Sequence, residues 1–352
     1  MAIGPAEIAG TSTALAEGLH ALGVDAELAL WSPLPGPFAS NHTCGRTGRA
    51  IYALRAPLRR DVLHFQYGVT WIPKHPDAHW ARILRRLLLS SYYGDDCRRW
   101  DVATRLAWPL APFKDRRQDG AVLERLERLA RLCRGAIASD VEVASYLVGV
   151  FERVYVAPVP LHNFAPPPRE PVRAASLRVL HAPTDRAVKG TPAVELAARE
   201  AAKHVPLELV LLTGVGHGAV RRELARADIV VDQMHSASAS VFALEGMRAG
   251  LPVLTHIDAR ALAPFHAELP VVPVTAESLA DDLVALAGDA SRRFDLGEAG
   301  RAYVDRWHSA PRAAEAVLQV YEHAREATAG VFVATPDGIS PLDAEVLAEI
   351  RR

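Results

Sequence analysis

Short apolar runs alternate with stretches of helical periodicity along most of the 352 residues. The apolar runs are bounded by turn residues or charges, as strands are, whereas residues 12–23 and 121–134 repeat apolar positions at helical spacing. Such alternation predicts an α/β fold in which parallel sheets are covered by helices on both faces. The predicted strands are residues 25–31, 61–68, 87–96, 135–139, 153–158, 177–183, 207–214, 227–233, 251–257 and 269–275.

A proline-rich segment divides this pattern into two similar halves. Residues 165–176 read APPPREPVRAAS, and prolines can neither continue a helix nor join a central strand. We therefore expect two Rossmann-like domains, residues 1–164 and 177–327, joined by this linker and facing across a cleft that can enclose a substrate. Residues 328–352 form a tail with a strand-like run, a turn and a short helix, for which the sequence indicates no function.

Composition and charge exclude several classes of protein. Hydrophobic residues make up 50% of the chain and charged residues 23%, which is typical of a globular protein with a sizeable core. The net charge is −1, because the 21 Lys and Arg against 17 Asp and Glu of residues 1–170 are balanced by 19 against 24 in the remainder. The protein therefore has no overall positive electrostatic field that would favour nucleic acid as a partner.

Cysteine usage and hydropathy indicate the compartment. Cys44, Cys97 and Cys133 lie far apart and form no C-x-x-C pair, which predicts a reducing cytoplasm rather than a disulfide framework or a zinc site. The start of the sequence has no basic segment followed by an apolar one, and no run approaches the about 18 apolar residues of a membrane span. We expect a soluble cytoplasmic protein.

Two cations stand where a predicted strand leads into a helix. Arg186, Lys189 and Gly190 lie in the polar turn of the segment LRVLHAPTDRAVKGTPAVELAARE, residues 177–200. Ligands of open α/β sheets bind at the carboxyl ends of strands, and helix N-termini favour anions, so this position predicts a phosphate site. The alternative is that both cations are solvated in a surface turn.

A second informative segment covers residues 225–258. A strand ending at Asp232 leads through a loop of small residues into a helix that begins near Val241 and carries Glu245 one turn in. Glu245 is then either a ligand-binding carboxylate or a helix acid that is favoured by the macrodipole.

The combination of these motifs resembles a known family. HAPTDRAVKGT, followed about forty residues later by ADIVVDQ and VFALEGMRAGLPV, resembles the family-four retaining glycosyltransferases of GT-B architecture. Residues 3–28 resemble the first strand, glycine loop and helix of that superfamily, and YYGDDCR, residues 92–98, resembles its turn after the fourth strand. The resemblance covers most of residues 3–325.

The resemblance implies a nucleotide-sugar donor site in the second domain. Arg186 and Lys189 match the cations that neutralise the donor diphosphate, with Gly190 and the amides near Ser240 and Val241 beside them. Two cations and helix-terminal N–H groups stabilise a departing diphosphate without a metal. Glu245 matches the glutamate that accepts hydrogen bonds from the ribose hydroxyls.

The reaction implied is transfer of a hexosyl group with retention of configuration. It uses no cofactor, and no covalent nucleophile is nominated. The acceptor is a sugar, a lipid-linked or a small molecule, in the setting of bacterial polysaccharide or glycoconjugate biosynthesis. There is no Asp-x-Asp motif, and the adjacent Asp95 and Asp96 would point to opposite faces of an extended strand, so no metal is expected.

Two positions depart from the family pattern. Ala237 stands where the earlier glutamate of a glutamate pair is expected, and Tyr93 stands where many relatives carry a histidine that contacts the sugar. Tyrosine is a poor base near neutral pH. Asp96 and Arg98 do match the turn, either as site residues or as a surface ion pair. These departures leave a second hypothesis, a GT-B protein that binds nucleotide-sugar without turning it over.

The first domain supplies the candidates for the acceptor or sugar side. Gly10 and Thr11 follow the first strand, where a glycine lets backbone approach a ligand or simply makes a tight turn. His64, near the end of residues 61–68, reaches the cleft or is a core histidine with satisfied hydrogen bonds. Tyr93 and Asp96 complete this set. The amphipathic helix of residues 121–134 packs on the core or, as the alternative, docks on a membrane surface as a peripheral contact.

A competing fingerprint points to a different class of enzyme. Gly214, Gly216 and Ala219 form G-x-G-x-x-A after a strand, and Asp232 ends the next strand, as in an NAD-dependent oxidoreductase. The following helix is short, however, and the motif lies in the second unit of its sheet rather than the first, where the dinucleotide fingerprint belongs.

Overall fold

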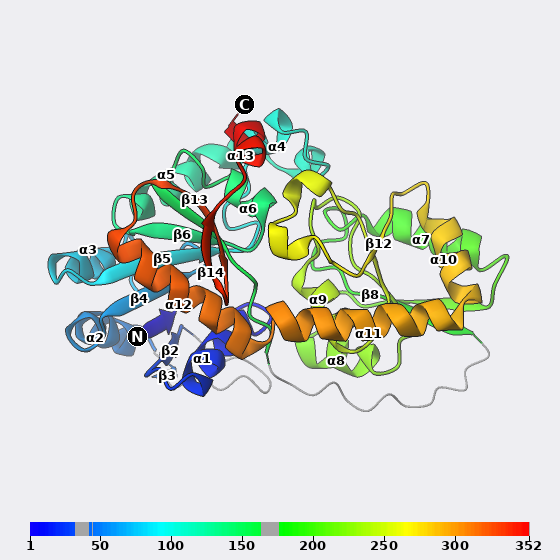
Figure 1. Cartoon of the computed structure of the whole chain (residues 1–352), viewed down its shortest axis with the longest axis horizontal. Coiled ribbons are helices and arrows are strands. Elements are labelled where there is room, and N and C mark those ends of the chain that lie inside the picture. The colour runs from blue at the N-terminus through cyan, green and yellow to red at the C-terminus, as the bar shows by residue number, and fades with distance from the viewer. Residues whose placement is uncertain (32–41, 44, 163–175, 352) are drawn as a thin grey trace. The chain divides into compact units, whose positions relative to one another are not determined.

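Two parallel β-sheets organise the chain, each in its own unit (Figure 1). The structure is a computed structural model that describes residues 1–31, 42–43, 45–162 and 176–351. Unit 1 comprises Met1–Ala107, Lys114–Asn163 and Trp307–Arg352, and unit 2 comprises Trp108–Phe113 and Phe164–Arg306. Cys44 and all but the last residue of the predicted linker lie outside the described residues.

The sheet of unit 1 has nine strands within the described part of the chain, in the order β14-β13-β7-β6-β5-β4-β1-β2-β3. All neighbours are parallel except β13 and β14. The strand order reverses between β1 and β4, the point at which Rossmann folds bind ligands. The strands are β1 Ala2–Gly4, β2 Glu27–Leu30, β3 His42–Thr43, β4 Val62–Gln66, β5 Leu87–Tyr92, β6 Gly135–Ala138, β7 Arg153–Val156, β13 Gly330–Thr335 and β14 Gly338–Pro341.

Helices cover the sheet of unit 1, and the closest pair is α1 and α12. A Cβ atom on Gly18 of α1 would lie 1.9 Å from the carbonyl oxygen of Ala310, so only glycine allows this approach. The helices are α1 Thr11–Ala21, α2 Arg46–Arg59, α3 Pro76–Ile83, α4 Trp100–Arg105, α5 Asp119–Ala130, α6 Val141–Ser145, α12 Ala310–Glu326 and α13 Ala344–Arg351, with a 3-10 turn at Arg116–Gln118.

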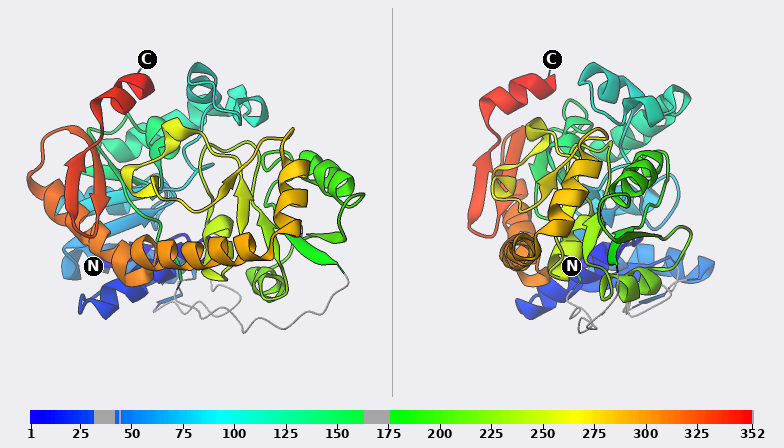
Figure 2. Two further views of the ribbon diagram at one scale, coloured as in Figure 1. Left: turned by 45° about the vertical axis from the view of Figure 1, so that its right-hand side comes forward. Right: turned by 90° about the vertical axis from the view of Figure 1, so that its right-hand side faces the viewer.

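The C-terminal tail is part of unit 1. β13 pairs with β7 along Gly330–Val333, and the ring of Phe332 stacks on that of Tyr155 with centroids 5.3 Å apart. Figures 1 and 2 show this hairpin along the edge of the sheet. Residues 307–327, which the sequence-based boundaries assign to the second domain, also belong to unit 1, because α12 packs on α1 and β13.

The sheet of unit 2 is parallel, with the order β12-β11-β10-β8-β9 in the described residues. The order reverses between β8 and β10, which is a second Rossmann-like switch point. Helices α7 and α10 pack side by side (Figure 2). The elements are β8 Leu177–His181, α7 Thr191–Ala201, β9 Leu207–Leu211, α8 His217–Leu224, β10 Ile229–Val231, α9 Val241–Arg248, β11 Val253–Thr255, β12 Val272–Pro273, α10 Leu279–Gly288 and α11 Ala290–Trp307, with 3-10 turns at Ala111–Phe113, Ala259–Ala261 and Pro264–His266.

The predicted α/β architecture is confirmed. Each of the ten predicted strands overlaps a strand of the structure, and the predicted helices of residues 12–23 and 121–134 overlap α1 and α5. In α5 the apolar face is turned to the core, since Leu126 and Leu129 are fully buried. The structure therefore confirms the interpretation that this amphipathic helix packs on the core.

Candidate functional site

The switch point of unit 2 brings Lys189, Gly190 and Asp232 together. They follow β8 and β10, which are neighbours in the sheet. Gly190 has a φ of 70° and precedes α7, and a Cβ atom there would lie 2.6 Å from Cβ of Met234. Only glycine fits this left-handed, crowded position, and it sets Lys189 beside the end of β10.

Asp232 is a buried carboxylate with structural partners. It accepts a hydrogen bond from the Ser240 N–H at 2.9 Å and another from the Ser240 hydroxyl at 2.6 Å. The Lys189 Nζ lies 3.4 Å from Asp232 Oδ1, and the Lys189 side chain is 16% exposed. Asp232 therefore anchors the N-terminus of α9 and orients the lysine.

The two helix N-termini differ in the donors they offer. The Thr191 N–H of α7 donates to the carbonyl of Arg186 at 2.8 Å, and Pro192 has no N–H. At the start of α9, the N–H groups of its first turn have no intrahelical acceptor, and Ser240 and Val241 are partly exposed. The positive end of α9 is thus the better place for an anion.

Arg186 is placed less favourably than Lys189. Its Nη2 lies 2.8 Å from Oε1 of Glu195 on α7, and the arginine side chain is half exposed. An ion pair this exposed contributes little to stability, so the guanidinium remains available to a ligand.

Glu245 lies one turn into α9 and is almost fully buried. Its Oε1 is hydrogen-bonded to Nε2 of His217, the first residue of α8. Burial lowers the pKa of the nearby Arg221, and the Glu245 carboxylate opposes that shift. Glu245 thus faces two basic side chains from α8, neither of which the sequence singled out.

The loop from Gln233 to Ser240 is built around a buried amide. The Gln233 Nε2 donates to the carbonyls of Ser236 at 3.1 Å, Ser238 at 3.2 Å and His256 at 3.0 Å. Ala237 is fully buried in this loop. Since position 237 is an alanine, the loop from Gln233 to Ser240 has no carboxylate that could orient a sugar.

The dinucleotide fingerprint does not lie at the switch point. Gly214 and Gly216 follow β9, the edge strand of the sheet, which pairs with β8. Asp232 is 1% exposed and already accepts the hydrogen bonds described above. To bind a ribose, Asp232 would have to lose its hydrogen bonds to Ser240 at the N-terminus of α9. This requirement counts against the oxidoreductase interpretation.

The switch point of unit 1 holds Gly10, Thr11 and Tyr93. Gly10 precedes α1 with a φ of 80°, and the Thr11 hydroxyl lies 2.8 Å from that of Tyr67. The rings of Tyr67 and Tyr93 pack with centroids 4.8 Å apart, and the Tyr93 hydroxyl donates to Oε1 of Gln66 at 3.0 Å. Burial raises the pKa of Tyr93, so this phenol does not act as a base.

A partly buried carboxylate, Glu7, completes this cluster. It accepts hydrogen bonds from the Thr13 N–H at 2.7 Å and the Ser12 N–H at 3.2 Å, and so caps α1. Burial raises the pKa of Glu7, while the hydrogen bonds from Thr13 and Ser12 lower it.

Asp96 holds the turn after β5. Its carboxylate accepts hydrogen bonds from the Tyr93 N–H at 3.1 Å and the Gly94 N–H at 2.7 Å. Burial raises the pKa of Asp96 to about 6, although these hydrogen bonds oppose the shift. Arg98 pairs with Glu142 rather than with Asp96, through its Nε at 2.8 Å. Both residues of the matched turn therefore have structural partners.

His64 lies in the core of unit 1. It is fully buried, with Nδ1 2.7 Å from the Tyr321 hydroxyl and Nε2 2.6 Å from the Ser91 hydroxyl. Burial lowers the pKa of His64 to about 3, so the ring is neutral. The structure supports the interpretation of a core histidine with satisfied hydrogen bonds.

Comparison with known proteins identifies solved structures of similar fold. No protein-family profile matches the chain, and no curated protein matches its sequence. Sucrose-phosphate synthase from Thermosynechococcus elongatus shares 16% identity with a TM-score of 0.59, covering 88% of this chain and 91% of that one. HepE of Anabaena, solved with UDP and glucose, shares 13% identity with a TM-score of 0.60, covering 91% of this chain and 98% of that one. WaaG, a glycosyltransferase involved in lipopolysaccharide biosynthesis, shares 14% identity with a TM-score of 0.58, covering 91% of this chain and 99% of that one.

The chain has the GT-B fold. At these levels of identity the likeness is one of architecture, and both Rossmann-like units of this fold are present. Within the described part of the chain, no group of three or more His, Cys, Asp and Glu side chains is arranged to hold a metal ion. Across the same residues, no helix is both long and apolar enough to cross a membrane.

Several residues at the two switch points were missed from the sequence. Gln66 ends β4 and Tyr67 directly follows it, and the reversal of strand order beside β1 is the signal that could have identified them. His217 gave no such signal, because its proximity to Glu245 depends on the packing of α8 against α9.

Proposed function

We propose that this GT-B protein is a glycosyltransferase that moves a hexosyl group from a nucleotide-sugar to an acceptor with retention of configuration and without a metal. The observation that carries the proposal is the switch point of unit 2, where Lys189 lies, through Asp232 and Ser240, beside the N-terminus of α9, the helix that carries the buried carboxylate of Glu245 one turn in. A nucleoside diphosphate needs these three features: charge for the phosphates, N–H donors, and an acceptor for ribose hydroxyls.

In the proposed reaction, the bond from the anomeric carbon to the diphosphate breaks as the acceptor oxygen bonds to the same face of that carbon. The acceptor proton passes to the departing phosphate oxygen. Lys189, Arg186 and the first-turn N–H groups of α9 stabilise the negative charge that develops on the diphosphate. Glu245 binds the ribose once its contact with His217 is exchanged for the hydroxyl groups.

The acceptor side is proposed to lie in unit 1, at Gly10, Thr11 and Tyr93. Tyr67 and Tyr93 are partly exposed and pack together at this switch point, with the buried Thr11 hydroxyl beside that of Tyr67, and such an aromatic surface suits a sugar ring. Asp96 supports the turn that positions Tyr93. His64 remains beneath this surface as a core residue.

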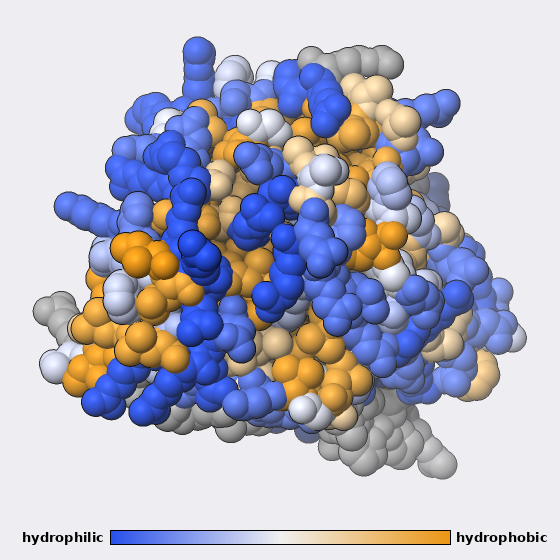
Figure 3. Space-filling view, turned by 60° about the vertical axis from the view of Figure 1, so that its left-hand side comes forward, coloured by the Kyte–Doolittle hydropathy of each residue, from blue (hydrophilic) through white to orange (hydrophobic). Residues whose placement is uncertain are grey.

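The acceptor class is proposed to be a sugar, a lipid-linked or a small molecule. Ile51, Leu54 and Leu58 of α2 are large apolar side chains that are about half exposed. Their spacing puts them on one helix face, where a peripheral contact with a membrane would form for a lipid-linked acceptor. The surface in Figure 3 carries separate hydrophobic patches among hydrophilic side chains, so any such contact is local.

Binding without turnover is the second candidate function. Ala237 favours it, since this buried alanine leaves the loop before α9 without the carboxylate that would orient a sugar. Hydrolysis of the donor in the absence of acceptor separates the two functions, because a binder would leave the donor intact.

The test compares Lys189→Ala and Glu245→Gln with the wild type in the presence of EDTA. UDP and UDP-glucose are the first ligands to try, because UDP is bound in the structure of HepE. Lys189→Ala should lose about 2 to 4 kcal/mol of transition-state stabilisation in donor turnover. Glu245→Gln should weaken UDP binding by about 1.5 to 3 kcal/mol, since a charge-assisted hydrogen bond is lost.

Lys203→Ala is the matched control, because Lys203 is an exposed lysine of unit 2 that pairs with Glu200 on the surface. Unchanged turnover in Lys189→Ala, or activity that EDTA abolishes and magnesium restores, would contradict the proposal. GDP and GDP-sugars, titrated in parallel, identify the nucleoside.

A further inference from the structure

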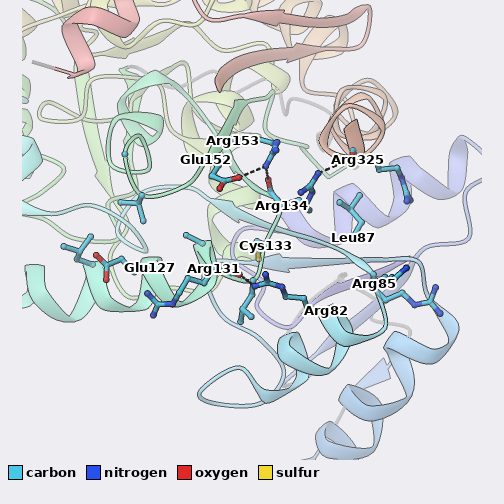
Figure 4. Close-up of a pocket in the computed structure, with 16 residues that line it drawn as sticks. Arg82, Arg85, Leu87, Glu127, Arg131, Cys133, Arg134, Glu152, Arg153 and Arg325 are labelled. Carbon is cyan, nitrogen blue, oxygen red and sulfur yellow. Dashed lines mark hydrogen bonds and ion pairs between the residues drawn. The ribbon is translucent and has the colours of Figure 1, made fainter. Parts of the chain in front are cut away.

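A basic cavity opens in unit 1 at the end of the sheet opposite the proposed acceptor residues. Its volume is about 1030 Å³, and seven arginines and two glutamates are among the residues that line it (Figure 4). Leu87, the first residue of β5, lies in its wall, whereas Tyr93 follows the last residue of the same strand. The cavity is therefore separate from the site at the carboxyl ends of the strands.

Four of the arginines have structural roles. Arg86 donates to the carbonyl of Pro57 at 2.7 Å, and Arg134 donates to the carbonyl of Arg325 at 3.1 Å. Arg82 donates to a carbonyl at the end of α5. Arg153, which is 8% exposed, donates to the carbonyl of Ala327 at 2.8 Å. These cations satisfy the carbonyl groups near the C-termini of helices, which is a sufficient reason for their presence.

The other three arginines that line the cavity have no such structural role. Within the described residues, the guanidinium groups of Arg85, Arg131 and Arg325 make no hydrogen bond or ion pair. They come from three separate elements: the turn after α3, the end of α5, and the last turn of α12. In Figure 4, Arg85 and Arg131 lie on one side of Leu87 and Cys133, and Arg325 lies on the other.

The backbone at Arg85 adds a second observation. This residue has a φ of 55° and ends α3 in the left-handed conformation, where glycine or asparagine is usual. A side chain in this conformation costs about 1 kcal/mol. Arg85 therefore occupies a position where glycine would be more stable, and its side chain lines the cavity.

The charge in the cavity is unbalanced. Of the two lining glutamates, Glu152 pairs with Arg153 at 3.1 Å. Arg86 pairs with Asp61 at 2.7 Å. The partial negative ends of the nearby helices offset part of the remaining positive charge. Among the described residues that line the cavity, Glu127 is the one acidic side chain left for the other five arginines. Such an excess of guanidinium groups around a hollow suits a ligand with several negative charges.

We propose that this cavity binds a phosphate-bearing polyanion. Guanidinium groups match phosphate oxygens in a bidentate geometry, and cations from three elements can contact more than one phosphate. Leu87, Leu132 and Cys133 give the wall an apolar part that suits the organic portion of such a ligand. The site binds rather than reacts, because burial raises the pKa of Cys133 to about 12 and leaves a neutral thiol.

The test is calorimetric titration of the full chain with sodium tripolyphosphate. The double variant Arg131→Gln/Arg325→Gln removes two exposed cations without breaking a contact of the fold. We expect it to weaken the affinity by about tenfold. Arg128→Gln/Arg292→Gln is the matched control, since it removes the same charge from α5 and α11 outside the cavity, and its affinity should equal that of the wild type.

A second arm distinguishes the source of the phosphate. Co-sedimentation with vesicles of phosphatidylglycerol and phosphatidylcholine reports binding to lipid headgroups, and vesicles of phosphatidylcholine alone are the control. Binding of vesicles that depends on Arg131 and Arg325, with no binding of tripolyphosphate, supports a lipid headgroup as the ligand. Binding of tripolyphosphate alone supports a soluble ligand.

The donor site must be excluded as the origin of the signal, because Lys189 can also bind phosphate. Lys189→Ala should leave cavity binding unchanged. The proposal is overturned if neither probe binds, if both double variants weaken binding equally, or if Lys189→Ala abolishes the signal. Loss of the signal in Lys189→Ala would place the phosphate at the proposed donor site, whereas the other two outcomes leave glycosyl transfer untouched, so failure of this inference can be told apart from failure of the proposed function.

Discussion

At the scale of single residues, burial decides which polar side chains are structural and which are available. His64 has the chemistry of a catalytic base, yet both of its ring nitrogens are occupied within the core. Lys189 is partly exposed beside a helix N-terminus, and this position leaves its charge available to a ligand. The packing around a polar side chain, and not its chemistry alone, therefore decides its role.

His64 leads to a prediction about stability and pH. Its pKa is lowered by burial to about 3 in the folded protein, against 6.5 for an ordinary histidine. Between these values the unfolded chain binds more protons than the folded one, so stability rises with pH and is lost as the pH falls. One such group contributes a slope of up to about 1.4 kcal/mol per pH unit in this range.

The measurement is urea unfolding of the wild type and His64→Gln at several pH values from 7 to about 4, a range chosen to lie within that interval. The variant should show a shallower loss of stability on acidification, and His204→Gln, an exposed histidine, should behave as the wild type. Some slope will remain in His64→Gln, because burial also lowers the pKa of His266 to about 4. Parallel curves for wild type and His64→Gln would show that His64 is protonated in the folded protein.

The sequence identified residues of the proposed donor site better than it identified the partners of those residues. Lys189 and Gly190 could be predicted because a turn after a strand has a known place in an α/β sheet. The hydrogen bond between His217 and Glu245 could not, since it joins α8 and α9 through tertiary packing that no spacing in the sequence encodes. Tyr93 and Asp96 were predicted as a pair of site residues, but their hydrogen bonds to the backbone and to Gln66 emerged only from the structure.

At the scale of elements, the loop between β10 and α9 illustrates how a strand end organises a helix start. Asp232 at the end of β10 receives the N–H and hydroxyl of Ser240, which precedes α9. Its negative charge also complements the positive end of the helix. Helix α9 therefore depends on the carboxylate of Asp232, which lies outside the helix.

Asp232→Asn should accordingly destabilise the protein while keeping the size of the side chain. Loss of charge-assisted hydrogen bonds in a buried place predicts a decrease of about 1.5 to 3 kcal/mol in the free energy of unfolding. The control is Asp305→Asn, whose carboxylate forms an exposed pair with Arg248 and should change stability by less than about 1 kcal/mol. Equal stability of Asp232→Asn and the wild type in urea would mean that α9 needs no such anchor.

Element prediction succeeded where apolar runs are long and failed where they are short. β5 begins with three leucines and β8 alternates Leu177, Val179 and Leu180 with two polar residues, each before a polar turn, and both were predicted. β3 has only His42 and Thr43, too few residues to show an alternation of polarity. β13 reads as a strand, but its position beside β7 follows from a pairing between residues far apart in the sequence.

At the scale of the whole molecule, the chain passes between the two units four times. It enters unit 2 for Trp108–Phe113, returns, enters again for Phe164–Arg306, and ends in unit 1. Trp108 is 3% exposed, and Arg260 of unit 2 lies over its ring at 4.7 Å. A proline-rich linker is visible in the sequence, whereas these returns depend on contacts between distant segments. Neither unit is therefore one continuous stretch of chain.

This connectivity predicts how fragments of the chain behave. Residues 177–327, the second domain as read from the sequence, carry α12 without the α1 and β13 surfaces that cover it. Val317, Val320 and Tyr321 would then be exposed, at about 1.5 to 3 kcal/mol for each large side chain. We expect this fragment to aggregate, and the fragment 177–306, which ends with unit 2, to be more soluble. Both lack the buried Trp108 and should unfold at a lower urea concentration than the full chain. Size-exclusion chromatography and urea unfolding provide the comparison, and a fragment 177–327 that is monomeric and as stable as the full chain would show that α12 does not need unit 1.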